Sequence, residues 1–287
     1  MSGAVEALFL AGASIQPLFA LHHPPAPDTP DAPAAPRGAV LYLHPFAEEM
    51  NKVRRMAALQ ARALAAAGYA VLQLDLRGCG DSGAEFEDAS WAGWLDDALF
   101  AARWLQQRYP AAPLWLWGAR AGCLLAAELA GRIDGPAPNL LCWAPVTSGR
   151  PHLQQFLRIK LAGALLDGGG AAAAGGLADM KRTLDDGGMV DVAGYRLPAA
   201  LARGLDNAKL TVPARPGRIA WLDVSSRAEP SLAPAAERWL AECRTAGHQV
   251  ASEIVAGPAF WQTLEIEEAP ALIDATVALL ERAPVEA

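Results

Sequence analysis

The sequence has little cysteine, no long apolar run and no basic cluster, and each absence excludes a class of protein. The four cysteines among 287 residues are widely spaced and form no Cys-x-x-Cys pair, which argues against a zinc site and fits a reducing compartment. No apolar run approaches the ~20 residues that a membrane-spanning helix needs. The formal net charge is −7 and no basic run stands out, so nucleic acid is not an expected partner. We expect no transmembrane segment, no metal and no cofactor.

The N-terminal part also lacks positive charge. No Lys or Arg precedes Arg37, and Glu6 lies in this stretch, so the basic region of a signal peptide is missing. Together with the sparse cysteines, this predicts a cytoplasmic protein. The composition, 53% hydrophobic and 19% charged, suits a globular protein with a sizeable core. The length is enough for one large α/β domain, and the sequence does not set the oligomeric state.

Short apolar runs alternate with helical stretches along most of the chain. Expected strands are an N-terminal hairpin over residues 5–10 and 15–22, then 39–43, 69–74, 114–117, 139–143, 218–224 and 250–255. Expected helices are 52–67, a helix capped by Ser90, one after residue 122, and then 234–246 and 269–282. Alternation at this spacing predicts a mostly parallel central sheet with helices on both faces.

The alternation breaks between residues 144 and 213. Helical stretches at 153–166, 177–184 and 198–205 accompany a Gly/Ala tract at 167–176, which predicts a flexible surface crossing. We therefore expect a single domain over residues 1–287. Its core would comprise about 1–143 and 214–287, and a helical lid insertion would comprise about 144–213.

Residues 114–122 read as an apolar strand followed by a glycine-flanked turn, and a helical stretch comes next. Strand, sharp turn and helix are the context of the nucleophile elbow of α/β-hydrolases, in which glycines relieve the crowding between strand and helix. The middle residue of that motif is a nucleophilic serine, and here it is Arg120. A guanidinium stays protonated and cannot attack. The sequence thus predicts the α/β-hydrolase fold without its reactive atom.

The rest of the catalytic triad is also incomplete. Ligand crevices of parallel sheets lie beyond the carboxyl ends of the strands, where Asp223 can fill the acid position. The loop after the last strand, residues 257–262, contains no histidine, and His248 precedes that strand and should lie at the opposite edge of the sheet. With nucleophile and base both absent, an ordinary serine-esterase mechanism is not expected. A replacement thiol, Cys79 or Cys123, would need a base beside it.

Arg120 and the start of its helix together make a candidate anion site. The helix presents free N–H groups and the positive end of its dipole, and the guanidinium adds a fixed charge. This combination suits a carboxylate or phosphate of a ligand. An internal carboxylate, Glu48, Glu49 or Asp223, could equally pair with the guanidinium.

Other residues at the strand ends complete the predicted pocket. His44 lies where the fold builds part of its oxyanion hole, or it is a hydrogen-bonded core histidine. Asp75 is expected to hold the N–H groups of a glycine-rich loop, and Trp261 would supply an aromatic wall or plain packing. The predicted pocket over Arg120 is lined by these three residues with Glu48, Glu49 and Asp223.

Several motifs resemble those of the exosortase A system-associated hydrolases of the second type. They are HPFAEEMNK at residues 44–52, LDLRGCGDS at 74–82, LWLWG at 114–118, FWQ at 260–262 and EEAPAL at 267–272. The resemblance covers nearly the whole chain. It implies an α/β-hydrolase fold in a bacterium that makes exopolysaccharide and sorts proteins through an exosortase (PEP-CTERM) system. It implies no defined reaction, because fold does not fix function.

Three functions remain open from the sequence. The first is a degenerate hydrolase that binds an anionic, acyl or glycosyl small molecule. The second is an active hydrolase in which Asp223, Glu48 or Glu49 activates water and Arg120 stabilises the oxyanion. The third is a scaffold for export-system partners, in which the crevice has no role.

Overall fold

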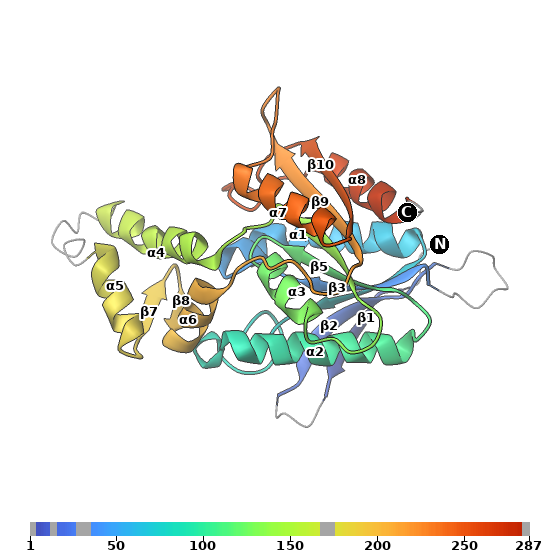
Figure 1. Cartoon of the computed structure of the whole chain (residues 1–287). Coiled ribbons are helices and arrows are strands. Elements are labelled where there is room, and N and C mark those ends of the chain that lie inside the picture. Colours follow the sequence, from blue (N-terminus) through green and yellow to red (C-terminus); the bar gives the residue numbers. More distant parts are fainter. Residues whose placement is uncertain (1–3, 12–15, 27–35, 167–175, 283–287) are drawn as a thin grey trace.

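A computed structural model describes residues 4–11, 16–26, 36–166 and 176–282 and has an eight-stranded sheet at its centre (Figure 1). The strand order is β1-β2-β4-β3-β5-β6-β9-β10. The strands are β1 (Glu6–Leu10), β2 (Leu18–His23), β3 (Gly38–Leu43), β4 (Tyr69–Leu74), β5 (Leu114–Ala119), β6 (Asn139–Trp143), β9 (Arg218–Ser225) and β10 (Gln249–Ala256). Strands β1 and β2 pair antiparallel, and every pair from β4 to β10 is parallel.

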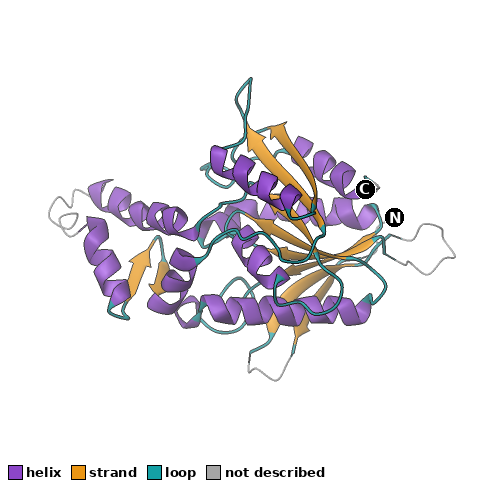
Figure 2. Ribbon diagram, in the orientation of Figure 1, coloured by secondary structure: helices purple, strands orange, loops and turns teal. Residues whose placement is uncertain are grey.

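Helices cover both faces of this sheet (Figure 2). One face packs on α1 (Glu48–Ala66) and α8 (Pro270–Glu281). The other packs on α2 (Trp91–Arg108), α3 (Gly122–Ala130) and α7 (Pro234–Thr245). Two apolar cores result, one on each side of the central strands, and the predicted mostly parallel, two-sided architecture is confirmed.

The chain between β6 and β9 forms a segment at one end of the sheet, which we call the insertion (Figure 1). It contains α4 (Gly149–Leu166), α5 (Gly176–Asp185), β7 (Met189–Val192), β8 (Tyr195–Pro198) and α6 (Ala199–Asn207). The hairpin of β7 and β8 was not predicted. The predicted Gly/Ala crossing lies outside the described residues except for Gly176. No helix in the described part of the chain combines the length and apolarity required to cross a bilayer.

Three predicted starts are wrong by several residues. Helix α4 begins at Gly149 rather than at Leu153. The second strand of the N-terminal hairpin begins at Leu18 rather than at residue 15. Helix α1 begins at Glu48 rather than at Lys52, so the two acidic residues that precede Lys52 form its first turn. Carboxylates are stabilised there by the positive end of the helix dipole. Because α1 starts at Glu48, the side chains of Glu48 and Glu49 lie near the C-terminal ends of the strands, on the side of the elbow.

The elbow itself has the predicted strand-turn-helix form. A Cβ added at Gly118 would lie 2.5 Å from the backbone of Cys123, and one at Gly122 would lie 2.2 Å from the carbonyl oxygen of Leu43. Only glycine fits at these two positions. Arg120 has φ 53°, in the left-handed region, and its N–H donates to the carbonyl of Trp143 at 2.9 Å. The turn therefore holds Arg120 in a conformation that non-glycine residues rarely adopt.

Replacing Gly122 by alanine is expected to lower the free energy of unfolding by about 2–3 kcal/mol, because the new methyl group must displace backbone. Urea denaturation of wild type and variant would measure the loss. Gly163 in α4 offers a matched control, since nothing lies within 4 Å of its added Cβ. Alanine at Gly163 should stabilise by roughly 0.5–1 kcal/mol through helix propensity. Equal effects at the two glycines would contradict the proposed crowding.

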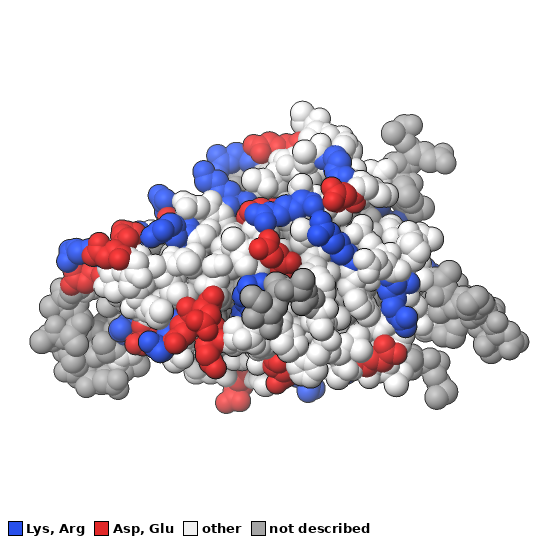
Figure 3. Space-filling model, turned by 90° about the horizontal axis from the view of Figure 1, so that it is seen from below, with Lys and Arg blue, Asp and Glu red and all other residues white. Residues whose placement is uncertain are grey.

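Charges of both signs occur on the face of the molecule shown in Figure 3. On the face shown in Figure 3, acidic and basic side chains intermingle, and most of that face carries neither. An extended cationic surface, which nucleic acid would require, is not present on this face.

Candidate functional site

The side chain of Arg120 lies in a nearly closed environment at the elbow. Its Nη1 donates to the carbonyl oxygen of Ala144 at 2.8 Å. Its Nε and Nη2 donate to Oε1 of Glu49 at 3.3 and 3.4 Å, and its guanidinium carbon lies 4.8 Å from the ring centre of Trp261. The side chain is only 13% exposed. A carboxylate, a carbonyl and an aromatic face thus share the positive charge.

Glu49 is the carboxylate partner, and it is itself buried. Burial raises its pKa to about 7, although the attraction of Arg120 opposes this rise. Its Oε2 lies 3.3 Å from Nε of Arg120 and 3.8 Å from Nε2 of His152, and no hydrogen bond to this oxygen forms within the described part of the chain. A carboxyl group with such a pKa titrates near neutral pH. The ion pair is therefore partly neutralised under ordinary conditions.

The third member of the cluster, His152, was not predicted. It comes from the first turn of α4 in the insertion, and its side chain is 5% exposed. Burial, and then the charge of Arg120, lowers its pKa to about 4, so the imidazole is neutral at pH 7. Its Nδ1 is buried and has no hydrogen-bond partner among the described residues. The sequence feature that could have identified His152 is its position shortly after the end of β6, where the carboxyl edge of the sheet lies.

A cavity of about 320 Å³ adjoins this cluster. Its wall includes His152 and Gln155 of α4, Ser148 before that helix, and Asp223 of β9. Asp223 accepts a hydrogen bond from Nε1 of Trp221 at 3.0 Å, and burial raises the pKa of Asp223 despite that bond and the charge of Arg120. His152 therefore belongs to the cavity wall and also lies within 3.8 Å of the carboxylate that Arg120 binds.

His44 and Asp75 lie away from this cavity. Nδ1 of His44 donates to the carbonyl of Pro45 at 2.7 Å, and burial lowers the pKa of His44, so the ring is a neutral core group. Asp75 accepts a hydrogen bond from the N–H of Asp81 at 3.0 Å, which holds the glycine-rich loop. Both residues line a separate, smaller cavity of about 60 Å³. The structure does not bring them together with Asp223.

The remaining candidates do not complete a triad. Burial raises the pKa of Glu48, which has no hydrogen bond or ion pair to Arg120. Sγ of Cys123 donates to the carbonyl of Gly118 at 3.1 Å, and burial raises the pKa of Cys123 and of Cys79, so both are thiols rather than thiolates. His248 lies just before β10 and donates from Nε2 to the carbonyl of Pro213 at 2.9 Å. Among the described residues, no serine or cysteine side chain is hydrogen-bonded to a histidine.

Comparisons with known proteins agree with the fold. The model of the family "Serine aminopeptidase, S33" matches residues 34–170, somewhat less than half of the chain. The structure superposes on Est1E from Butyrivibrio proteoclasticus with ferulic acid bound, with a TM-score of 0.64, 15% identity, and coverage of 96% of this chain and 98% of that one. It also superposes on a soluble variant of monoglyceride lipase from Saccharomyces cerevisiae in complex with a substrate analogue, with a TM-score of 0.58, 14% identity, and coverage of 99% and 97%. The chain therefore has the α/β-hydrolase fold.

Curated sequences show a shorter similarity. Lysophosphatidylserine lipase ABHD12 of Danio rerio is 33% identical over 114 residues, which is 39% of this chain and 28% of that protein. The protein of the same name from Xenopus tropicalis is 31% identical over a stretch of the same length. The matched region spans little more than a quarter of either relative, and the resemblance is thus to part of a lipase.

Proposed function

We propose that the protein binds a small molecule with a carboxylate or phosphate group and an acyl or glycosyl part, without forming a covalent serine intermediate. The site is the cavity beside Arg120, with His152 and Asp223 in its wall. The observation that carries this proposal is the guanidinium at the elbow, where the attacking hydroxyl of a serine hydrolase would lie. A guanidinium cannot act as a nucleophile, but it is well suited to hold an oxyanion.

The hydrogen bonds of Arg120 leave two of its N–H donors for a ligand, although the side chain is largely buried. A guanidinium has five N–H groups. Within the described residues Arg120 donates three hydrogen bonds, one each from Nε, Nη1 and Nη2. One N–H on each terminal nitrogen remains, the pair that binds a carboxylate or phosphate in the bidentate manner. The distances to Glu49 of 3.3 and 3.4 Å are long for charged groups, so a ligand anion can compete with this carboxylate.

An active hydrolase is the second candidate, and the pKa of Glu49 favours it. A carboxylate with a pKa of about 7 is well matched to general-base catalysis at neutral pH. In this version Glu49 takes a proton from water, and Arg120 stabilises the developing oxyanion. The esterase and lipase neighbours of the fold are in keeping with an acyl or ester substrate.

The biological setting is part of the proposal. We propose a ligand from exopolysaccharide metabolism, an association with an exosortase system, a cytoplasmic location and a lid role for the insertion. The first two depend on the sequence resemblance, the third on the few, widely spaced cysteines, and the fourth on the place of α4 beside the cavity. The loss of a working triad is proposed on the grounds given above.

Binding can be tested with matched pairs of ligands. Hexanoate and glucuronate, titrated by isothermal calorimetry, should bind about tenfold more tightly than hexanol and glucose, because the uncharged ligands leave the guanidinium donors unmatched. Arg120→Lys should reduce the carboxylate affinity about tenfold, since an ammonium lacks the planar fork. Arg54→Lys, at the smaller cavity, is the control and should leave the affinity unchanged. Equal binding of charged and uncharged ligands would contradict the proposed anion site.

Turnover separates the two candidates. Wild type and Arg120→Ser should both leave p-nitrophenyl butyrate unhydrolysed above background, because no imidazole is placed to activate a new serine. Hydrolysis by the wild type that is lost in Glu49→Gln would establish the second candidate instead. Labelling of a serine in this cavity by a fluorophosphonate probe would exclude both, since it requires an activated nucleophile.

A further inference from the structure

Helix α4 separates two cavities. Pro151, His152 and Gln155 line the cavity of Asp223, whereas Arg150 and Leu153 line a second cavity of about 460 Å³ between α4, α5 and α6. An α-helix turns about 100° per residue, so these two sets of side chains leave α4 on opposite faces. The second cavity is therefore distinct from the site beside Arg120.

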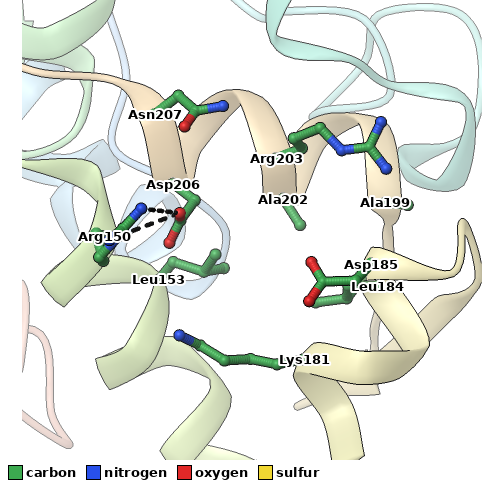
Figure 4. Close-up of a pocket in the computed structure, with 10 residues that line it drawn as sticks. All are labelled: Arg150, Leu153, Lys181, Leu184, Asp185, Ala199, Ala202, Arg203, Asp206 and Asn207. Atoms are coloured by element: carbon green, nitrogen blue, oxygen red, sulfur yellow. Dashed lines mark hydrogen bonds and ion pairs between the residues drawn. The ribbon is translucent and has the colours of Figure 1, made fainter. Parts of the chain in front are cut away.

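The second cavity has an apolar floor and a charged rim (Figure 4). Its floor consists of buried side chains from all three helices, Leu153, Leu184, Ala199 and Ala202. Its rim carries the cations Arg150, Lys181 and Arg203 and the carboxylates Asp185 and Asp206. An apolar surface beside unpaired charge is the arrangement that an amphiphile matches.

The rim carries an excess of positive charge. Nε and Nη2 of Arg150 donate to Oδ2 of Asp206 at 3.2 and 2.9 Å, and this ion pair neutralises both groups. Within the described part of the chain, the side chains of Lys181, Arg203 and Asp185 form no hydrogen bond or ion pair. Figure 4 shows Lys181 extending from α5 toward α4, on the side of Arg150, while Arg203 extends at the other end of the cavity.

We propose that this cavity binds a small amphiphile with a singly charged anionic head. The head is held by Lys181 and by the Nη1 group of Arg150, which the ion pair leaves free. The hydrocarbon part lies on Leu153 and Leu184, where it removes apolar surface from water. The unpaired charges of the rim, two cations and Asp185, leave an excess of one positive charge, which favours a monoanion over a polyanion. This site is independent of Arg120 and of the function proposed for it.

Octyl sulfate, a monoanion at neutral pH, is a suitable probe, with octyl glucoside and octylammonium as partners of the same chain length. Titration calorimetry below the micelle concentration should show octyl sulfate binding about tenfold more tightly than octyl glucoside, because only the charged head meets Lys181. Octylammonium should not bind measurably. Lys181→Glu should weaken octyl sulfate binding at least about tenfold, since it reverses the charge at the head. Arg120→Lys should leave this affinity unchanged.

The neighbouring residue of α5 supplies the matched control. Arg182 is 70% exposed and pairs with Asp179, and it does not line the cavity. Arg182→Glu makes the same change of net charge and should preserve binding. Ala202→Leu tests the apolar floor, since the added side chain fills it and should abolish binding, with circular dichroism to show that the variant folds. Equal binding by wild type and Lys181→Glu, equal losses in the two charge reversals, or unchanged binding by folded Ala202→Leu would overturn the proposal.

Discussion

Replacing Arg120 by methionine is expected to lower the free energy of unfolding by about 2–4 kcal/mol near pH 8, because the hydrogen bonds of the guanidinium are lost and Glu49, deprived of its partner, must take up a proton. Methionine retains much of the length of the side chain and its packing on Trp261. It removes the hydrogen bond to Ala144, the contacts to Glu49 and the cation–π contact of 4.8 Å. Urea denaturation, with the unfolding followed by tryptophan fluorescence, measures the loss.

The loss should be smaller near pH 5 by about 1 kcal/mol, which is the cost of protonating Glu49 one pH unit above its pKa. Glu49 already has a pKa of about 7 beside Arg120, and removing that cation raises the pKa further. Below this pKa the carboxyl group takes up a proton and no longer needs a counter-charge. For the same reason the double variant Arg120→Met/Glu49→Gln should recover about 1 kcal/mol of the loss near pH 8. A loss that is independent of pH and persists in the double variant would refute the importance of the buried charge.

Arg54 provides the exposed counterpart. Its ion pair with Asp75 has an N–O distance of 3.5 Å, and the arginine side chain is 47% exposed. Exposed pairs contribute little because water screens them, so Arg54→Met should cost no more than about 1 kcal/mol. The contrast between Arg54 and Arg120 tests whether burial determines the effect.

Local sequence was sufficient to predict the elbow and several boundaries. Glycines at 118 and 122 around one side chain require a turn that brings strand against helix, and the structure shows both contacts that exclude a Cβ. Ser90 was predicted as an N-cap, and its Oγ accepts a hydrogen bond from the N–H of Gly93 at 3.0 Å. Each of these features is determined by residues within a few positions of one another.

The partner of Arg120 could not be predicted, because it depends on helical register. Glu48 and Glu49 are adjacent, and side chains of adjacent helical residues point about 100° apart. With the helix expected from Lys52, both carboxylates lay in a loop and neither orientation was defined. The observed start at Glu48 directs Glu49 to Arg120 and leaves Glu48 without contact to it.

His152 and the hairpin of β7 and β8 were missed for different reasons. His152 reaches the elbow through the packing of the insertion, and no local pattern encodes that long-range contact. The hairpin turns at Ala193 and Gly194, both with positive φ. Asparagine or aspartate before glycine is the usual signal for such a turn, and alanine gives none. Strands of four residues add little periodicity.

Glu49 and His152 should give the protein opposing pH dependences of stability. Burial raises the pKa of Glu49 from 4.5 to about 7, so its contribution is fully present below pH 4.5 and is lost as the pH rises through 7. Burial lowers the pKa of His152 from 6.5 to about 4, so its contribution is present above pH 6.5 and is lost as the pH falls through 4. Each shift corresponds to about 3 kcal/mol.

In the wild type the two effects largely cancel between pH 4.5 and 6.5. As the pH rises through this range, the stabilising contribution of Glu49 decreases while that of His152 increases. A variant that lacks one of the two groups should reveal the pH dependence that the other group causes. Glu49→Gln should gain stability relative to wild type as the pH rises from 4.5 to 7, by up to about 1.4 kcal/mol per pH unit. His152→Gln should gain relative to wild type as the pH falls from 6.5 to 4. Urea denaturation at closely spaced pH values gives both differences.

Neighbouring charged groups also affect the pKa values of Glu49 and His152. Arg120, Glu48 and Lys52 act on Glu49, and Arg120 acts on His152, yet all three remain in both variants and cancel from the comparison to first order. Glu268→Gln, in an exposed pair with Arg55, is the control and should differ from wild type by less than about 1 kcal/mol at every pH. If Glu49→Gln and His152→Gln each differ from wild type by a constant amount between pH 4 and 8, their pKa values are not shifted by burial. The elbow cluster would then be open to water, and its carboxylate would be permanently ionised beside Arg120.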